Sequence, residues 1–163
     1  MDPRTKAELF QMYKSYKHEL WEYTGNNYED SLKDWFEEML TDRFVTVQPV
    51  RNAHTNSLIG FFATQALNRE QQEKSGCQWY ISESYILPSY RNQGSMTAVV
   101  HEFALHHQGN IGLTIVNGNY KAEKFWTHIF KMLGYEYEKE PCDWDDTASF
   151  YKFTHRLTGE QYL

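Results

Sequence analysis

Cysteine and long apolar runs are scarce in this chain of 163 residues. Its two cysteines, Cys77 and Cys142, lie far apart without the spacing of a metal site, and no apolar signal segment stands at the amino terminus. We therefore expect a reduced, cytoplasmic protein without a disulfide framework. Because no apolar run approaches the roughly 20 residues that a bilayer requires, we also expect no membrane span and no membrane partner.

Positive charge is in deficit as well. The chain has 16 Lys and Arg residues against 22 Asp and Glu, which gives a net charge of −6. A surface for duplex nucleic acid needs cations that neutralise phosphates, so we expect no nucleic-acid partner. A cationic or neutral substrate fits this charge better.

Metal-binding patterns are missing too. The histidines of residues 101–107 have a spacing one residue too long for a zinc-protease helix, and the acidic residues 143–146 lack the alternating oxygens and central glycine of a calcium loop. We predict no metal site. The aromatic content of 17% is high, and such residues fill a core or wall a pocket; the excess is compatible with a homodimer.

No Pro/Gly/Ser-rich stretch divides the chain and no internal repeat is visible. With 40% apolar residues, the sequence has enough material for one core. We therefore predict a single domain over residues 1–163.

Apolar periodicity predicts four helices, and β-branched and aromatic runs predict six strands. Asp30 and Ser31 are candidate caps for the second helix, and Gly134 is a candidate C′ residue for the fourth. The polar segment 68–76 is read as a connection. The expected helices cover residues 5–23, 32–40, 96–104 and 122–133, and the expected strands cover 44–50, 58–66, 77–87, 111–116, 135–139 and 148–154.

The most informative stretch is Trp79 to Gly118, where a strand pattern runs into Arg91-Asn92-Gln93-Gly94-Ser95-Met96 and then into an amphipathic helix. A strand, a glycine turn and a helix in this order aim unpaired backbone N–H groups and the positive end of a helix dipole at one point. Such a point binds anions, and pyrophosphate is the usual occupant. The next strand makes this segment a βαβ crossover in a mixed sheet.

Over roughly residues 44–137, these features resemble the GNAT superfamily of acyl-CoA-dependent N-acetyltransferases. The family's acetyl-CoA signature is Gln or Arg, two residues, Gly, one residue, then Gly or Ala. Arg91 and Gly94 match it, whereas Met96 stands where the family has a small residue. A second segment, residues 117–126 with Leu133-Gly134-Tyr135 after it, is similar to the family's helix beside the thiol arm of the coenzyme.

The resemblance implies an α/β (α+β) fold: a mixed, mostly antiparallel central sheet with about four flanking helices, whose central βαβ unit forms the acetyl-CoA site. It implies acetyl-CoA as cosubstrate. The pantetheine arm would run along Ile86 and Leu87, and the pyrophosphate would contact the positive charge of Arg91 and the backbone N–H groups of the loop. The coenzyme-binding residues implied in this way are Ile86, Leu87, Arg91, Asn92, Gln93, Gly94, Ser95, Met96, Asn117 and Trp126.

An amine that attacks a thioester directly must first lose its proton to a base. Glu83, on the strand before the loop, and Tyr80, at the position where the family often has a glutamate, are competing candidates. The plain alternative for Glu83 is an ion pair with a basic neighbour. Trp126 replaces the family's usual acidic tyrosine and its indole is a far weaker acid. For the role of the acid, Tyr120 has the hydroxyl closest to the expected tyrosine position. The preferred alternative is that its ring packs on the sheet.

The resemblance implies an N-acetyltransferase that moves an acetyl group from acetyl-CoA to an amine of a small molecule or peptide. In this fold the first two helices and the loops set the acceptor. Loss of the tyrosine leaves a second hypothesis open, a CoA-binding regulatory module without turnover. A third is an α/β interaction domain whose glycine turn binds nothing.

Overall fold

Six strands form the framework of the computed structural model, which describes residues 1–154. Hydrogen bonds connect them in the order β1-β2-β3-β4-β6-β5; the pairs β1/β2, β4/β6 and β5/β6 are antiparallel, and β3/β4 is parallel. This mixed, mostly antiparallel sheet confirms the predicted fold class. The strands are β1 Val45–Arg51, β2 Leu58–Ala66, β3 Trp79–Ile86, β4 Asn110–Val116, β5 Glu136–Pro141 and β6 Ala148–Thr154.

The chain divides into two compact units. The first unit contains residues 1–66 and 81–99, and the second contains residues 67–80 and those from 100 onward. The division passes through β3 and through the helix α4, Ser95–His106. Within residues 1–154, no helix has the length and apolar content needed to cross a bilayer.

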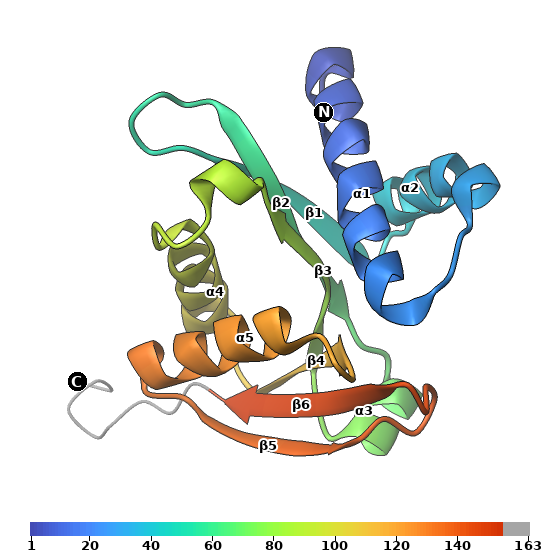
Figure 1. Cartoon of the computed structure of the whole chain (residues 1–163). Helices are drawn as coiled ribbons and strands as arrows, with labels where there is room; N and C mark the ends of the chain where they lie inside the picture. Colours follow the sequence, from blue (N-terminus) through green and yellow to red (C-terminus); the bar gives the residue numbers. More distant parts are fainter. Residues whose placement is uncertain (155–163) are drawn as a thin grey trace. The chain divides into compact units, whose positions relative to one another are not determined.

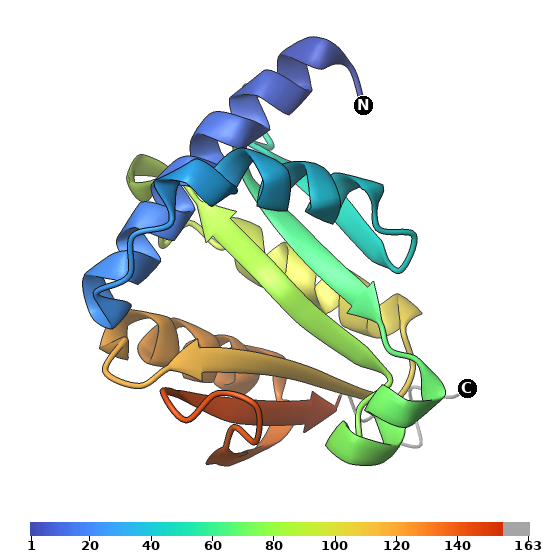
Figure 2. The ribbon, with the colours of Figure 1, turned by 90° about the vertical axis from the view of Figure 1, so that its right-hand side faces the viewer.

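The first unit is built on helices α1, Pro3–Thr24, and α2, Leu32–Thr41, which cover one face of β1 and β2 (Figures 1 and 2). The Asp2 side chain caps α1 by accepting a hydrogen bond from the Thr5 N–H at 3.0 Å. Gly25 ends α1 in the left-handed conformation, with φ of 72°. A short 3₁₀ turn, Glu29–Ser31, leads into α2.

Aromatic and aliphatic side chains from α1, α2, β2 and β3 form the core of the first unit. Phe36 of α2 lies between rings of α1, with centroid distances of 5.1 Å to Phe10 and 5.4 Å to Tyr13. The recurrence of apolar residues every three or four positions along both helices explains this packing. The buried members are Leu9, Met12, Tyr13, Leu32, Phe36, Leu58, Phe61 and Tyr85.

In the second unit, α5, Tyr120–Leu133, packs along β5 and β6 (Figure 1). Phe130 of α5 is 1% exposed, and its ring centroid lies 4.7 Å from that of Phe153 on β6. Gly134 follows α5 with φ of 70°, as the sequence predicted for a C′ residue. The register of β3 on β4 pairs Trp79 with Ile111.

Two predictions about helices were wrong. The polar segment 68–76 contains a fifth helix, α3, Arg69–Ser75, which begins with a capping box between Asn68 and Gln71. Ser31 precedes α2, but its side chain makes no capping hydrogen bond. The 3₁₀ turn explains this difference, because it gives Ser31 helical rather than extended backbone angles.

Gly60 permits close pairing of β2 with β3 in the first unit. A Cβ atom at this position would collide with the carbonyl oxygen of Tyr85 and lie 2.8 Å from Cδ1 of Ile86. We expect Gly60→Ala to lower the free energy of unfolding by about 1–3 kcal/mol, as overpacking does. Chemical denaturation measures this loss. Gly60 does not have a positive φ, so the collision and not left-handed strain accounts for the expected loss, and an unchanged free energy of unfolding in Gly60→Ala would contradict the prediction.

Candidate active site

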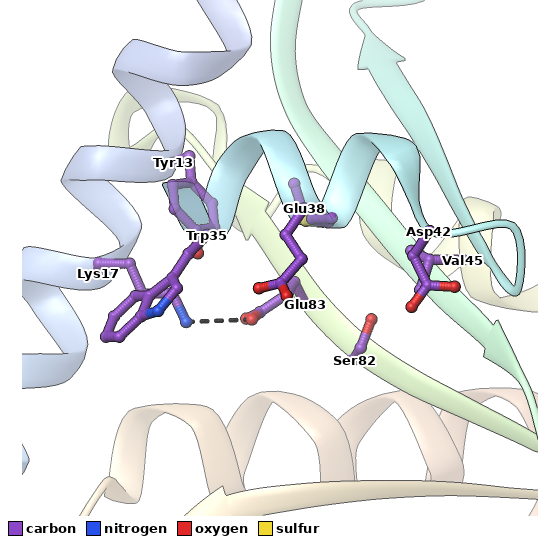
Figure 3. Close-up of a pocket in the computed structure, with 9 residues that line it drawn as sticks. Tyr13, Lys17, Trp35, Glu38, Asp42, Val45, Ser82 and Glu83 are labelled. Atoms are coloured by element: carbon purple, nitrogen blue, oxygen red, sulfur yellow. Dashed lines mark hydrogen bonds and ion pairs between the residues drawn. The ribbon is translucent and has the colours of Figure 1, made fainter. Parts of the chain in front are cut away.

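A cavity of about 440 Å³ lies within the first unit, between α1, α2 and the adjoining strands (Figure 3). Helical spacing explains how one face of α2 supplies three of its walls, at positions i, i+3 and i+4, and Asp42 follows directly after the helix. Glu83, one of the two candidate bases, lines this cavity together with Ser82. The full lining is Tyr13, Lys17, Trp35, Glu38, Met39, Asp42, Val45, Ser82 and Glu83.

Glu83 is held by a lysine from the first helix. The Lys17 ammonium lies 3.1 Å from the Glu83 carboxylate, and the two side chains are only 16% and 20% exposed (Figure 3). The same ammonium lies over the rings of Tyr13, Tyr16 and Trp35 at 5.4, 5.4 and 5.9 Å. Aromatic faces attract cations, so Lys17 occupies a cation-binding box. The alternative role for Glu83, an ion pair with a basic neighbour, is therefore observed, and the neighbour is Lys17.

The field inside this cavity is negative. Burial, with the nearby Glu83 and Glu38 carboxylates adding to it, raises the pKa of Tyr13 well above its ordinary value. Tyr13 therefore stays protonated at neutral pH.

The predicted coenzyme loop also lies in the first unit, directly after β3. Asn92 and Gly94 both adopt positive φ, 63° and 81°. The backbone N–H groups of residues 92–96 donate no hydrogen bond to any other described residue, while the Ala98 N–H bonds to the Gly94 carbonyl as α4 begins. Free N–H groups at a helix start fit an anionic phosphate. Met96, at the position where a small residue was expected, is buried at 4% exposure.

Arg91 is engaged within the protein. Its Nε donates to the Ile86 carbonyl at 2.7 Å, and its guanidinium donates to both Glu19 oxygens at 3.0 Å. It also lies 5.3 Å from the centre of the Tyr85 ring. Arg91 therefore fixes the loop to α1, and Glu19 offsets much of the charge that the sequence assigned to phosphate binding.

The other predicted site residues belong to the second unit. The Tyr80 hydroxyl forms a 2.8 Å hydrogen bond with that of Thr114. Asn117 donates its backbone N–H to Thr147 at 2.8 Å, and its Oδ1 accepts from Ser149 at 2.8 Å. Its side chain thus ties β4 to β6. These residues hold local structure, and the catalytic role of Tyr80 and the coenzyme-binding role of Asn117 remain predictions.

Two residues of α5 were also assigned roles. Trp126 is 6% exposed and packs against Phe130, with ring centroids 6.2 Å apart. Tyr120 is 75% exposed at the first position of the helix. The packing of Tyr120 on the sheet, preferred from the sequence, is therefore wrong, because the first turn of α5 holds this ring in solvent.

Nucleophilic cysteine and metal chemistry have little support in the described part of the chain. Cys77 is fully buried, and burial raises the pKa of its thiol to about 11, so little thiolate exists at neutral pH. Within residues 1–154, no three His, Cys, Asp or Glu side chains are grouped closely enough to hold a metal ion.

Sequence reasoning missed most of the cavity. It assigned no role to Lys17, Glu38 or Asp42, and it treated Tyr13 and Trp35 as helix positions only. The available signal was spacing: Tyr13 and Lys17 share one face of α1, and Trp35, Glu38 and Met39 share one face of α2. This spacing indicates a cavity only once both helices are placed against β3.

Comparisons with known proteins agree with this fold. The family model described as Acetyltransferase (GNAT) family matches residues 7–132. This chain belongs to the GNAT acetyltransferase family. No curated protein matches the sequence.

Three solved structures illustrate the shared fold. NAA60 of Arabidopsis thaliana, with a bisubstrate analogue, is 15% identical, with a TM-score of 0.60 and coverage of 94% of this chain and 95% of that chain. Diaminobutyrate acetyltransferase EctA of Paenibacillus lautus, with its substrate and coenzyme A, is 11% identical, with a TM-score of 0.59 and coverage of 96% and 93%. A spermidine N-acetyltransferase SpeG chimera from Vibrio cholerae and hSSAT is 13% identical, with a TM-score of 0.58 and coverage of 94% and 92%.

Proposed function

We propose that this protein is an N-acetyltransferase that moves an acetyl group from acetyl-CoA to an amine of a small molecule or peptide by direct attack. The observation that carries the proposal is the loop of residues 91–96, in which the N–H groups of residues 92–96 have no partner among the described residues at the start of α4. Free N–H groups at a helix N-terminus suit a pyrophosphate.

Acetyl-CoA supplies an acetyl group activated as a thioester. The loop N–H groups bind its phosphates, and Ile86 and Leu87, which end and follow β3, run beside the pantetheine arm. Asn117 and Trp126, in the second unit, stay coenzyme-binding predictions from the sequence. Arg91 contributes by holding the loop on Glu19 and on the Ile86 carbonyl.

The acceptor enters as an amine that is protonated at neutral pH. A base takes one proton, the free nitrogen forms the new C–N bond, and the nitrogen then loses a second proton to solvent as the C–S bond breaks to release the coenzyme as a thiolate. Glu83 is the preferred base because it lines the cavity, whereas the Tyr80 hydroxyl is bonded to Thr114. The thiolate takes its proton from solvent, and the acid role of Tyr120 stays a prediction from the sequence.

The cavity of Figure 3 is the proposed acceptor site. Its carboxylates and aromatic rings suit an ammonium group. EctA is described with L-2,4-diaminobutyric acid as its substrate, and SpeG is named for spermidine, so amine acceptors occur in this fold.

A calorimetric titration with acetyl-CoA tests the proposal. We expect micromolar binding to the unaltered protein and at least tenfold weaker binding to Gly94→Val, because φ of 81° strains any residue with a Cβ and moves the loop N–H groups. Gly25→Val is the matched control, since its φ is 72° and no atom lies within 4 Å at either glycine.

Weaker binding in both glycine variants would trace the loss to general strain. No acetyl-CoA binding to the unaltered protein would overturn the proposal. Binding without thiol release across a panel of amines would favour the second candidate, a CoA-binding regulatory module, which the tryptophan at position 126 supports.

A further inference from the structure

The charges of the acceptor cavity do not balance. Three carboxylates line it, from Glu38, Asp42 and Glu83, against the single ammonium of Lys17. The cavity therefore carries two uncompensated negative charges when these groups are ionised. An acceptor with one ammonium group would leave one carboxylate without a partner.

Lys17 shows what kind of ligand these walls accept. Its alkylammonium group, on α1, contacts the Glu83 carboxylate, on β3, and lies over three aromatic rings. The combination of a carboxylate with ring faces is a recognition site for organic cations. The protein therefore already binds one alkylammonium in this cavity, its own.

The other two carboxylates lack such a partner. None of the ion pairs formed by residues 1–154 includes Glu38 or Asp42. Glu38 belongs to the last turn of α2 and Asp42 follows the helix as its C-cap residue; both residues are exposed, and Asp42 accepts a hydrogen bond from the Phe44 N–H at 2.8 Å. In Figure 3 the side chains of Glu38 and Glu83 both extend into the cavity.

A small metal ion does not fit this arrangement, since the described residues form no cluster of three metal-ligating side chains. A longer organic dication does, because its charges are separated by a chain that can lie along Met39 and Val45 on the cavity wall. The volume of about 440 Å³ is large enough for a short aliphatic chain with polar ends.

We propose that the acceptor is an aliphatic diamine or polyamine, with one ammonium group held by Glu38 and Asp42 and the amine that reacts placed beside Ser82 and Glu83. This inference rests on the proposed N-acetyltransferase function, which it narrows to a substrate class. The reacting end then lies on β3, three residues before Ile86, where the coenzyme arm is proposed to run.

Direct binding without acetyl-CoA tests the inference. We expect calorimetry to show 1,4-diaminobutane binding at least tenfold more tightly than 1-aminobutane, which has the same chain and one charge fewer, and more tightly than 4-aminobutyrate. Raising the salt concentration is expected to narrow the difference, because exposed charges are screened.

The double variant Glu38→Gln with Asp42→Asn is expected to lose this preference, with its affinity for 1,4-diaminobutane falling to that for 1-aminobutane. Glu37→Gln is the matched control: it removes one charge from α2, but this residue pairs with Lys6 and does not line the cavity. A preference for the diamine that survives in the double variant would overturn the inference.

Acetyl transfer tested separately keeps the two proposals distinguishable. If the protein binds acetyl-CoA and acetylates 1-aminobutane as efficiently as 1,4-diaminobutane, the diamine inference is overturned and the N-acetyltransferase proposal stands. Tight diamine binding by a protein that does not bind acetyl-CoA would overturn the transferase and leave the cation preference of the cavity standing.

Discussion

Glu83→Gln is expected to lower kcat for acetyl transfer by about 10²–10³-fold, the effect of removing a general base. Glutamine keeps the size of the side chain but cannot take the proton of the acceptor amine. Thiol release at saturating acetyl-CoA and amine measures kcat. Calorimetry is expected to show the affinity for acetyl-CoA unchanged within twofold, because Glu83 lies outside the loop of residues 91–96.

Loss of the ion pair with Lys17 is the competing explanation for such a result. Lys17→Met breaks the same 3.1 Å contact but keeps the carboxylate, so it is expected to lower kcat less than tenfold. An equal loss in Lys17→Met and Glu83→Gln would assign Glu83 a positioning role only.

Tyr80→Phe tests the other candidate base. Because the Tyr80 hydroxyl already bonds to Thr114 at 2.8 Å, we expect a change in kcat below about fivefold. A large loss in Tyr80→Phe with full activity in Glu83→Gln would transfer the role of base to the tyrosine.

The sequence predicts most elements of this fold because apolar spacing and turn residues agree along most of the chain. β2 and β6 have the predicted bounds, and Gly134 ends α5 in the left-handed conformation. α3 escaped prediction because its sequence, REQQEKS, has no apolar residue that could show a helical period. Its signals were local: Asn68 and Gln71 at the start, and Gly76 at the end.

The candidate site was predictable in part for a physical reason. The loop of residues 91–96 depends on backbone and glycine chemistry within one continuous segment, so a motif can describe it. The acceptor cavity depends instead on three separate elements, and no local pattern shows that Lys17 meets Glu83, 66 positions later. Likewise, the pairing of Arg91 with Glu19 depends on where α1 lies in the first unit.

Phe36→Ala is expected to lower the free energy of unfolding by about 3–5 kcal/mol, the usual cost of emptying the volume of a buried phenylalanine. Phe36 is 2% exposed and contacts Phe10 and Tyr13 of α1. Helix contacts on either side leave little room for collapse, so the lost ring leaves a cavity. Chemical denaturation measures the change, and Met132→Ala, at a side chain 65% exposed, is expected to cost less than about 1 kcal/mol.

The same substitution links stability to function, because Trp35 and Glu38 lie on α2 and Asp42 follows its last residue. In the fraction of Phe36→Ala that remains folded, we expect weaker binding of 1,4-diaminobutane and unchanged binding of acetyl-CoA, since the loop of residues 91–96 is anchored to α1 through Glu19. Equal loss of both ligands would mean that α2 and the loop depend on one shared core. A cost below about 1 kcal/mol would mean that Phe36 does not hold α2 in place.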